Sequence, residues 1–546
     1  MLEVTGSLRD SVRAPGHEAT TSAWWLSLAS GGLHALALSP WVAGWHPALP
    51  ALVQTLALAL LVSVLAGQGS VRRAALVAWL HGSVWLVGAT GWMFVSLHHF
   101  GGMPAWLSAL AVALLCMALS GYLALVGAVW LCCRRGSPWA DAVLFGALWL
   151  LAELARALIF TGFPWGASGY ALIDTPWVRL APWVGVYGMG AIWATLVALA
   201  TLGWVAGSGR DARSGAGAHT GAGPFVDKRR WLTLLPAIVL TAGLAAWSPA
   251  PHTHPHGQPL KVALLQSNVA QDEKFDARML GAMLVWHRQQ LQQAQADLVV
   301  APETAIPLLP AQLPEGYWEE ILAMFGPGQG RSALIGVPLG SLEEGYSNSV
   351  VGLSPEAARP YRYDKHHLVP FGEFIPLGFH WFVDMMNMPL GDFSRGPLSA
   401  PSFAVKGQRV GPNICYEDLF GEELASRFVQ ADKAPTLFAN VSNLAWFGDT
   451  VAIHQHLQIA RMRSLEFQIP TIRSTNTGAT VVIDHQGRVV RRMPGQTRGV
   501  LIAEVQGQAG VTPYAAWAGR AGLWPLVGVG LLLVGALAWP ALRRRA

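Results

Sequence analysis

Apolar and polar positions divide this chain into two kinds of sequence. Long apolar runs occupy residues 21–248 and 521–541, whereas residues 258–507 alternate apolar and charged positions as a water-soluble domain does. Each span-length run approaches the ~20 residues that a helix needs to cross a bilayer. The pattern therefore predicts membrane-spanning helices on both sides of a soluble domain. The eight expected spans are residues 21–40, 47–67, 74–97, 104–131, 139–160, 180–206, 231–248 and 521–541.

We expect three units: a membrane domain of seven transmembrane helices at 1–248, a soluble domain at 258–507, and a C-terminal helix with a basic tail at 521–546. Basic residues predict the orientation, because Lys and Arg concentrate in short cytoplasmic loops. With eight spans, the basic segments all fall on one side of the membrane. They contain Arg9 and Arg13, Arg72 and Arg73, Arg134 and Arg135, residues 210–230, and Arg543 to Arg545. Both termini are then cytoplasmic, and the soluble domain is extracytoplasmic.

Composition supports a membrane protein and argues against a nucleic-acid partner. Charged residues make up 13% of the chain and hydrophobic residues 52%, with 25 tryptophans, whereas an average soluble domain carries about 25% charged residues. The net charge is +5, but the basic residues outside the soluble domain lie mainly in short loops beside apolar runs. They therefore indicate membrane topology rather than a nucleic-acid surface.

Within the soluble domain, short apolar strands alternate with helical patterns. Near-continuous apolar strands indicate a sheet that is covered on both faces. We therefore expect an α/β layered domain. Strands are predicted to begin near Leu260, Asp297, Ala333, Ser347, Arg409, Thr436 and Thr480, and helices are predicted at 279–295, 418–430 and 450–467.

The stretch QRVGPNICYEDLF, residues 408–420, carries the candidate nucleophile. An apolar strand ends at Ile414, and Cys415 is followed at once by a polar segment that can start a helix. The first turn of a helix favours thiolate over thiol and can hold an oxyanion. Of four cysteines, Cys415 is the one in the soluble domain, so it has no disulfide partner there. The alternative interpretation is a buried structural cysteine.

Two other strand ends carry charged groups that can act on this thiol. Glu303 ends the apolar strand in DLVVAPETAIP, and Lys365 and Glu373 lie in the segment YDKHHLVPFGEFIP. A carboxylate in a dry site is suited to general-base catalysis. A lysine beside it can stabilise a thiolate or a tetrahedral oxyanion. Together, Glu303, Lys365 and Cys415 predict one site for nucleophilic attack on a carbonyl.

These three motifs, in this order, resemble those of the nitrilase superfamily, whose members carry a Glu-Lys-Cys triad on an αββα sandwich. The flanking spans, TGFPW at 161–165 and HLVPFGEF at 367–374 extend the resemblance to the membrane-embedded apolipoprotein N-acyltransferases of the bacterial inner membrane. The resemblance implies that Glu303, Lys365 and Cys415 are catalytic. It also implies supporting roles around the site for Glu373, Tyr416 and Glu417. Phe275, in KFD, stands where the family commonly has a tryptophan, so an indole N–H is lost there.

An enzyme of this family moves an acyl chain from a membrane phospholipid onto its cysteine as a thioester. It then passes the chain to the N-terminal amine of a diacylglyceryl-cysteine apolipoprotein. The resemblance thus implies an inner-membrane enzyme with its catalytic domain on the periplasmic face. Two alternatives are a membrane-tethered amidase, in which water resolves the thioester, and a transporter or receptor whose outer domain only binds ligand.

No metal or other cofactor is expected. The soluble domain has neither a Cys/His ligand cluster nor a glycine-rich phosphate loop. His454 and His456 form an HxH pair without a third suitable ligand, which is a weak metal signal.

Two segments allow more than one interpretation. Glu153 and Arg156 lie on one face of the fifth predicted span, where they are expected to neutralise each other or to line a polar cavity. The irregular segment 160–170 follows, either as part of a lipid or substrate site or as an aromatic belt. Residues 376–397, which include Trp381, are strongly apolar. This segment is predicted either to pack into the core or to form a mobile lid that adapts to acyl chains at the membrane surface.

Overall fold

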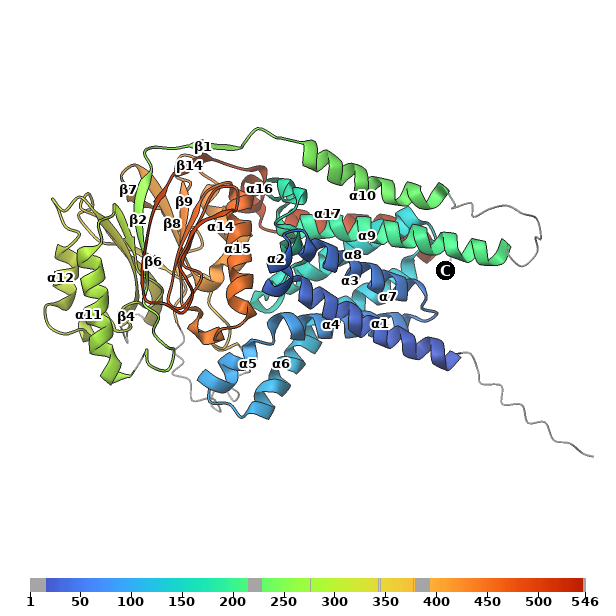
Figure 1. Ribbon diagram of the computed structural model, residues 1–546, viewed down its shortest axis with the longest axis horizontal. Helices are drawn as coiled ribbons and strands as arrows, with labels where there is room; N and C mark the ends of the chain where they lie inside the picture. Colours follow the sequence, from blue (N-terminus) through green and yellow to red (C-terminus); the bar gives the residue numbers. More distant parts are fainter. Residues whose placement is uncertain are drawn as a thin grey trace, which may run out of the picture.

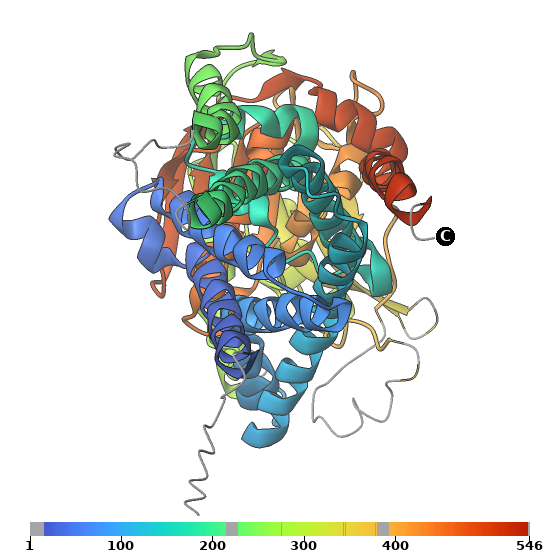
Figure 2. The same ribbon diagram turned by 90° about the vertical axis from the view of Figure 1, so that its right-hand side faces the viewer.

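The molecule is elongated, with a helical bundle at one end and a layered α/β domain at the other (Figure 1). The computed structural model describes residues 16–214, 228–274, 276–341, 343, 345–376, 378 and 393–543. From the bundle end, the helices lie in front of the sheets (Figure 2). The chain enters the layered domain from one helix of the bundle and returns to the bundle after leaving it.

The apolar runs form the long helices of the bundle, and each of the eight predicted spans overlaps at least one of them. By length and composition, four helical segments among the described residues can cross a membrane, or six if each of two sharply bent pairs counts as one span. The number eight therefore stays a prediction. The helices are α1 (Gly16–Ala37), α2 (Pro40–Trp45), α3 (Leu49–Ala66), α4 (Val71–Thr90), α5 (Met93–Val95), α6 (Ala105–Leu119), α7 (Gly121–Cys133), α8 (Pro138–Leu158), α9 (Ala181–Ser214), α10 (Lys228–Ala246) and α17 (Trp524–Arg543).

Two neighbouring arginines join helix ends at the side of the bundle away from the layered domain. Arg134 Nη1 donates a hydrogen bond to the carbonyl oxygen of Ala66, 2.8 Å away, near the end of α3. Arg135 Nη2 donates to the carbonyl oxygen of Ala536 in α17, at 2.9 Å. The first bond satisfies a carbonyl group at the end of α3, and the second ties the start of α8 to α17. The C-terminus lies at this same end (Figure 1).

Two six-stranded sheets form the centre of the layered domain; their central strands are buried, whereas the edge strand β12 is exposed along its length. One sheet has the order β13-β2-β3-β4-β5-β6 and the other β12-β11-β10-β9-β8-β7, while β1 pairs with β14 apart from both. The strands are β1 (Thr253–Pro255), β2 (Leu260–Gln266), β3 (Leu298–Val300), β4 (Ser332–Ser341), β5 (Gly345–Leu353), β6 (Tyr361–Asp364), β7 (Phe403–Val405), β8 (Gln408–Ile414), β9 (Leu437–Ser442), β10 (Thr471–Thr475), β11 (Val481–Ile483), β12 (Val489–Arg492), β13 (Gly499–Val505) and β14 (Gln508–Gly510).

Helices cover the outer face of each sheet, so the layers run helix, sheet, sheet, helix. Helices α11 (Ala277–Gln293) and α12 (Tyr317–Ala323) cover the first sheet, and α15 (Val451–Phe467) lies on the second (Figure 1). Apolar side chains of the two sheets meet between them in one core. The predicted α/β layered domain is therefore confirmed.

The helix predicted at 418–430 is broken into short pieces. A 3₁₀ turn, η6, spans Cys415–Leu419, and α14 spans Gly421–Ala425. Phe420 between them has φ −103° and ψ 77°, which no helix accommodates. This break brings Gly421 so close to the guanidinium of Arg463 that a Cβ atom there would collide with it. Tertiary packing therefore overrides the helical pattern of this segment.

The layered domain and the bundle share a continuous hydrophobic core. Tyr416, Phe420 and Met462 of the layered domain belong to the same buried cluster as Trp85 and Trp149 of the bundle. In Figure 1, α15 and α14 are the layer that faces the bundle. The turn that directly follows Cys415 is thus packed, together with α15, against the apolar helices.

Candidate active site

Cys415 lies at a strained corner where β8 ends. It has φ +51°, a left-handed conformation that is uncommon for a residue with a side chain. Such strain costs on the order of 1–3 kcal/mol and persists only when the surroundings enforce it. Part of that enforcement comes from Glu417. Its Oε2 accepts a hydrogen bond from the backbone N–H of Ile414 at 2.6 Å, and its Oε1 accepts one from the N–H of His366 at 2.7 Å.

Glu303 is held with both carboxylate oxygens in use. Oε1 accepts a hydrogen bond from Asn348 Nδ2 at 2.8 Å, and Oε2 accepts one from the backbone N–H of Asn443 at 2.7 Å. The backbone oxygen of Glu303 also accepts a bond from Lys274 Nζ at 3.1 Å. The carboxylate therefore has a fixed orientation in a site that is almost closed to water.

Lys365 is buried between two carboxylates. Its Nζ lies 2.9 Å from Oε1 and 2.9 Å from Oε2 of Glu373, and 3.7 Å from Oε1 of Glu303. Burial by itself lowers the pKa of Lys365, but the two carboxylates outweigh burial and raise the pKa above its ordinary value. The lysine is thus a permanent positive charge beside the nucleophile.

Burial favours the neutral thiol of Cys415, whereas the strand-to-helix corner was expected to favour the thiolate. Burial raises the pKa of the Cys415 thiol, and the Glu303 carboxylate raises it further, whereas Lys365 opposes both. The expected helix N-terminus is a single 3₁₀ turn of five residues, too short for a substantial dipole. Attack by the sulfur therefore requires that its proton be transferred at the moment of reaction, and Glu303 is the neighbouring acceptor.

Three groups that contact Glu303 were not named as site residues from the sequence. Asn348 bridges the site, since its Nδ2 also donates to Glu373 Oε1 at 2.7 Å. Asn443 contributes a backbone N–H, which a sequence cannot reveal. Lys274 is buried, and this burial lowers its pKa to about 8, although Glu303 and Cys415 act in the opposite direction. A signal did exist for Asn348, because SNS is a polar interruption in an otherwise apolar strand.

Three of the supporting residues named from the sequence lie within the described part of the chain. Glu373 and Glu417 lie in the site. Tyr416 points away from it and donates its hydroxyl hydrogen to the carbonyl oxygen of Gly162 in the bundle at 3.1 Å. Phe275 and Trp381 lie outside the described residues, as does most of the segment 376–397. Their roles stay predictions.

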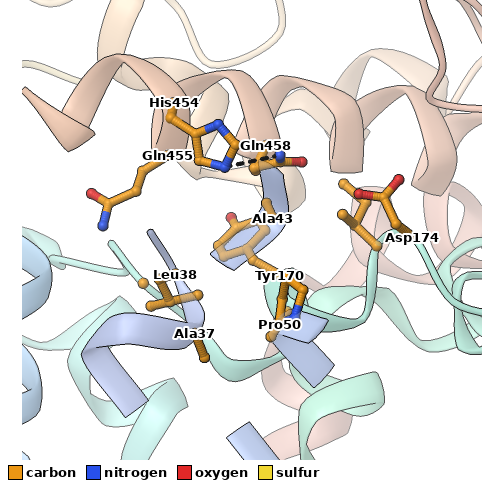
Figure 3. Close-up of a pocket in the computed structure, with 12 residues that line it drawn as sticks. Ala37, Leu38, Ala43, Pro50, Tyr170, Asp174, His454, Gln455 and Gln458 are labelled. Atoms are coloured by element: carbon orange, nitrogen blue, oxygen red, sulfur yellow. Dashed lines mark hydrogen bonds between the residues drawn. The ribbon is translucent and has the colours of Figure 1, made fainter. Parts of the chain in front are cut away.

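A separate hollow lies between the bundle and α15 (Figure 3). It has about 430 Å³ of space, part of it open solvent, and none of Glu303, Lys365 and Cys415 lines it. His454 and Gln458 of α15 face it, and the Nε2 atoms of the two side chains are 3.2 Å apart (Figure 3). Within the described part of the chain, no group of three or more Cys, His, Asp or Glu side chains is arranged to hold a metal ion.

Similarity to known proteins covers both parts of the chain. Residues 30–200 match the model of the apolipoprotein N-acyltransferase N-terminal domain, and residues 261–514 match that of carbon-nitrogen hydrolases. Among solved structures, Nit3 of Saccharomyces cerevisiae, a member of the nitrilase superfamily, is 18% identical over 47% of this chain and 93% of its own, with a TM-score of 0.34.

Two relatives are similar over nearly their whole length. An apolipoprotein N-acyltransferase of Verminephrobacter eiseniae is 45% identical over 527 residues, which cover 92% of this chain and 89% of that protein. One of Ralstonia nicotianae is 43% identical over 527 residues, which cover 94% and 92%. With this identity over both the bundle and the layered domain, the chain belongs to the apolipoprotein N-acyltransferase family.

Proposed function

We propose that this enzyme transfers an acyl chain from a membrane phospholipid, through a thioester on Cys415, to the N-terminal amine of a diacylglyceryl-cysteine apolipoprotein. One observation carries the proposal: Cys415 lies in a buried site with Glu303 and Lys365, and the residue directly after it, Tyr416, belongs to the hydrophobic core that the layered domain shares with the apolar bundle. The amidase alternative has less support, because a hydrolase of soluble amides needs no such bundle and the relatives bear the name of the acyltransferase.

In the first half-reaction, Glu303 takes the thiol proton while the sulfur of Cys415 attacks the ester carbonyl of the phospholipid. The tetrahedral oxyanion is stabilised by the ammonium of Lys365, which stays charged because Glu373 holds it at 2.9 Å. The C–O bond then breaks, and the proton on Glu303 passes to the departing alcohol of the lysophospholipid. The acyl chain remains on Cys415 as a thioester.

In the second half-reaction, the amine of the acceptor attacks the thioester carbonyl. Glu303 now accepts a proton from the amine, the C–S bond breaks, and the amide product leaves. The proton on Glu303 returns to the Cys415 sulfur. The same base thus serves both steps, and no redox group is required.

We also propose the topology expected from the sequence. The chain would cross the inner membrane eight times, with a membrane domain at 1–248, a periplasmic catalytic domain at 258–507, and a last helix with its basic cytoplasmic tail at 521–546. The arginine contacts near Ala66 and Ala536 support it, because basic residues gather at the bundle end opposite the catalytic domain. A single cysteine near Ser137 should resist an impermeant thiol reagent in spheroplasts, and one near Gly257 should react. The reverse pattern would contradict this orientation.

The acyl-enzyme is the decisive test of the chemistry. Full-length protein incubated with phospholipid and no acceptor should gain the mass of one acyl chain on the peptide that contains Cys415, and hydroxylamine should remove it. Cys415→Ala should gain no mass, whereas Cys116→Ala, at another buried free cysteine in α6, should behave as wild type. A synthetic diacylglyceryl-cysteine peptide should then discharge the thioester much faster than water does. Equal discharge by water would favour the amidase, and transfer by Cys415→Ala would refute the mechanism.

A further inference from the structure

Two charged side chains at the end of α8 bond to a backbone segment that touches the catalytic domain. We call this segment, residues 159–168, the anchor loop. Glu153 Oε1 accepts a hydrogen bond from the N–H of Ser168 at 2.7 Å, and Arg156 Nη1 donates one to the carbonyl oxygen of Trp165 at 2.8 Å. Both side chains are buried, and each makes a hydrogen bond to the backbone of the anchor loop. The opposite charges of Glu153 and Arg156 also attract each other, in agreement with the expected mutual neutralisation, and the two loop bonds are an additional role that the sequence did not predict.

Burying two charges in an apolar bundle is costly unless the charges are paired or hydrogen-bonded, and such charges are usually functional. A charge-assisted hydrogen bond to a backbone group is about twice as strong as a neutral one. Here the charged donor Arg156 bonds to a backbone carbonyl of the loop, and the charged acceptor Glu153 bonds to a backbone N–H of the same loop. Glu153 and Arg156 therefore fix the course of the anchor loop more firmly than neutral side chains would.

The anchor loop needs this support because its backbone is strained. Phe160, Thr161 and Gly162 have φ values of +55°, +71° and +88° in succession. The Phe160 side chain is 91% exposed, so burial of its ring does not offset the strain. At Gly162 a side chain is excluded on two grounds, since a Cβ atom would also collide with the carbonyl oxygen of Ala157. Strained backbone of this kind is found where the surroundings enforce a functional geometry.

The strained turn presents a carbonyl group to the catalytic domain. The oxygen of Gly162 accepts the hydroxyl hydrogen of Tyr416, the residue directly after the nucleophile. Glu417 holds the backbone before Cys415 through the N–H of Ile414. The left-handed conformation of Cys415 is thus held on one side by the catalytic domain itself and on the other by the bundle.

A second contact ties the anchor loop to α15. The indole N–H of Trp165 donates to Gln455 Oε1 at 2.7 Å, and the indole of Trp92 donates to the same oxygen at 3.3 Å. Figure 3 shows Gln455 beside His454 on α15, at the hollow between the catalytic domain and the bundle. The loop is therefore fixed to both parts of the molecule, and a shift of the loop would move Tyr416.

We propose that Glu153 and Arg156 are positioning residues for acyl transfer. They hold the anchor loop so that the Gly162 carbonyl receives the Tyr416 hydroxyl and keeps the Cys415 sulfur aimed at its substrate. The inference rests on the proposed function, in which this sulfur attacks in the first half-reaction and leaves in the second. The membrane bundle is then part of the active-site scaffold as well as an anchor for the domain.

A double-mutant cycle tests this proposal. Tyr416→Phe removes one hydroxyl, and Arg156→Lys keeps the charge but loses the planar donor of the guanidinium. Each single variant should lower the kcat of acyl-enzyme formation roughly 3- to 10-fold, the worth of one hydrogen bond, and leave the KM for phospholipid unchanged. The double variant should be no slower than the slower single variant, because both changes break the same connection. Multiplicative losses, or a wild-type rate in Arg156→Lys, would overturn the proposal.

A matched pair of glycine variants gives an independent measurement. Gly162→Ala displaces the strained turn and should slow acylation by at least the factor seen for Tyr416→Phe. Gly136→Ala is the control, since Gly136 also has a left-handed φ of +77° but lies before the other end of α8 with no atom near its missing Cβ. It should acylate at the wild-type rate. Equal rates in the two glycine variants would overturn the proposal. Transfer activity in Cys415→Ala would instead refute the proposed function, so the two failures are distinguishable.

Discussion

Asn348 is the residue whose replacement best tests how the site is built. Its side-chain amide donates at 2.8 Å to Glu303 and at 2.7 Å to Glu373, so it sets the spacing of the two carboxylates. Asn348→Leu keeps a similar volume but removes both bonds. A hydrogen bond to a charged group contributes about 1.5–3 kcal/mol. If the bond to Glu303 alone is lost from the transition state, acylation should slow roughly 10- to 150-fold.

The assay is the single-turnover rate of acyl-enzyme formation with phospholipid, measured by intact mass alongside the melting temperature. Gln266→Leu is the control, because Gln266 is also a buried amide with two bonds from its Nε2, here to the carbonyl oxygens of Pro494 and Thr497. This control should lose stability but acylate within about 3-fold of wild type, since no charged group of the site is its partner. Our reasoning is refuted if Asn348→Leu acylates as fast as Gln266→Leu.

Three further outcomes are expected. Lys365→Met should destabilise the protein by about 3–5 kcal/mol, because two buried carboxylates lose their counter-charge. Adding Glu373→Gln to this variant should recover part of the melting temperature but no activity. A Lys365→Met protein as stable as the wild type would contradict this. Burial lowers the pKa of Lys274 to about 8 in the folded protein, whereas an unfolded lysine has a pKa of about 10.4. Between these two pH values the unfolded state binds more protons than the folded state. The stability of the wild type should therefore rise with pH in this range, relative to Lys274→Met, by on the order of 1 kcal/mol per pH unit. If the difference in stability between the wild type and Lys274→Met does not change with pH in this range, Lys274 is not buried as described. Cys415→Ala should melt as wild type and form no acyl-enzyme, and loss of folding in this variant would point to a structural cysteine.

Local sequence properties predicted the long helices of the bundle and seven of the fourteen strands that the structure describes, but not the break in the helix expected at 418–430. A helix satisfies its own backbone hydrogen bonds, so apolar runs of membrane-spanning length adopt it, and each predicted span overlaps a helix. The seven strands predicted from apolar runs all lie in the two sheets, where helices and the facing sheet cover them. The candidate residues Glu303, Lys365 and Cys415 were recognisable because they occur together, in this order, in motifs that resemble those of the nitrilase superfamily.

Only the tertiary structure decided how those residues act. The sequence favoured a thiolate at Cys415, yet burial raises the pKa of the thiol, and burial depends on which parts of the chain pack around it. The hydrogen bond from Tyr416 to Gly162 joins residues 254 positions apart, and the bond from Asn443 to Glu303 uses a backbone group. Neither leaves a mark in the amino-acid pattern. Periodicity reports interactions between near neighbours in the chain, whereas desolvation and long-range contacts are set by the packing of the whole molecule.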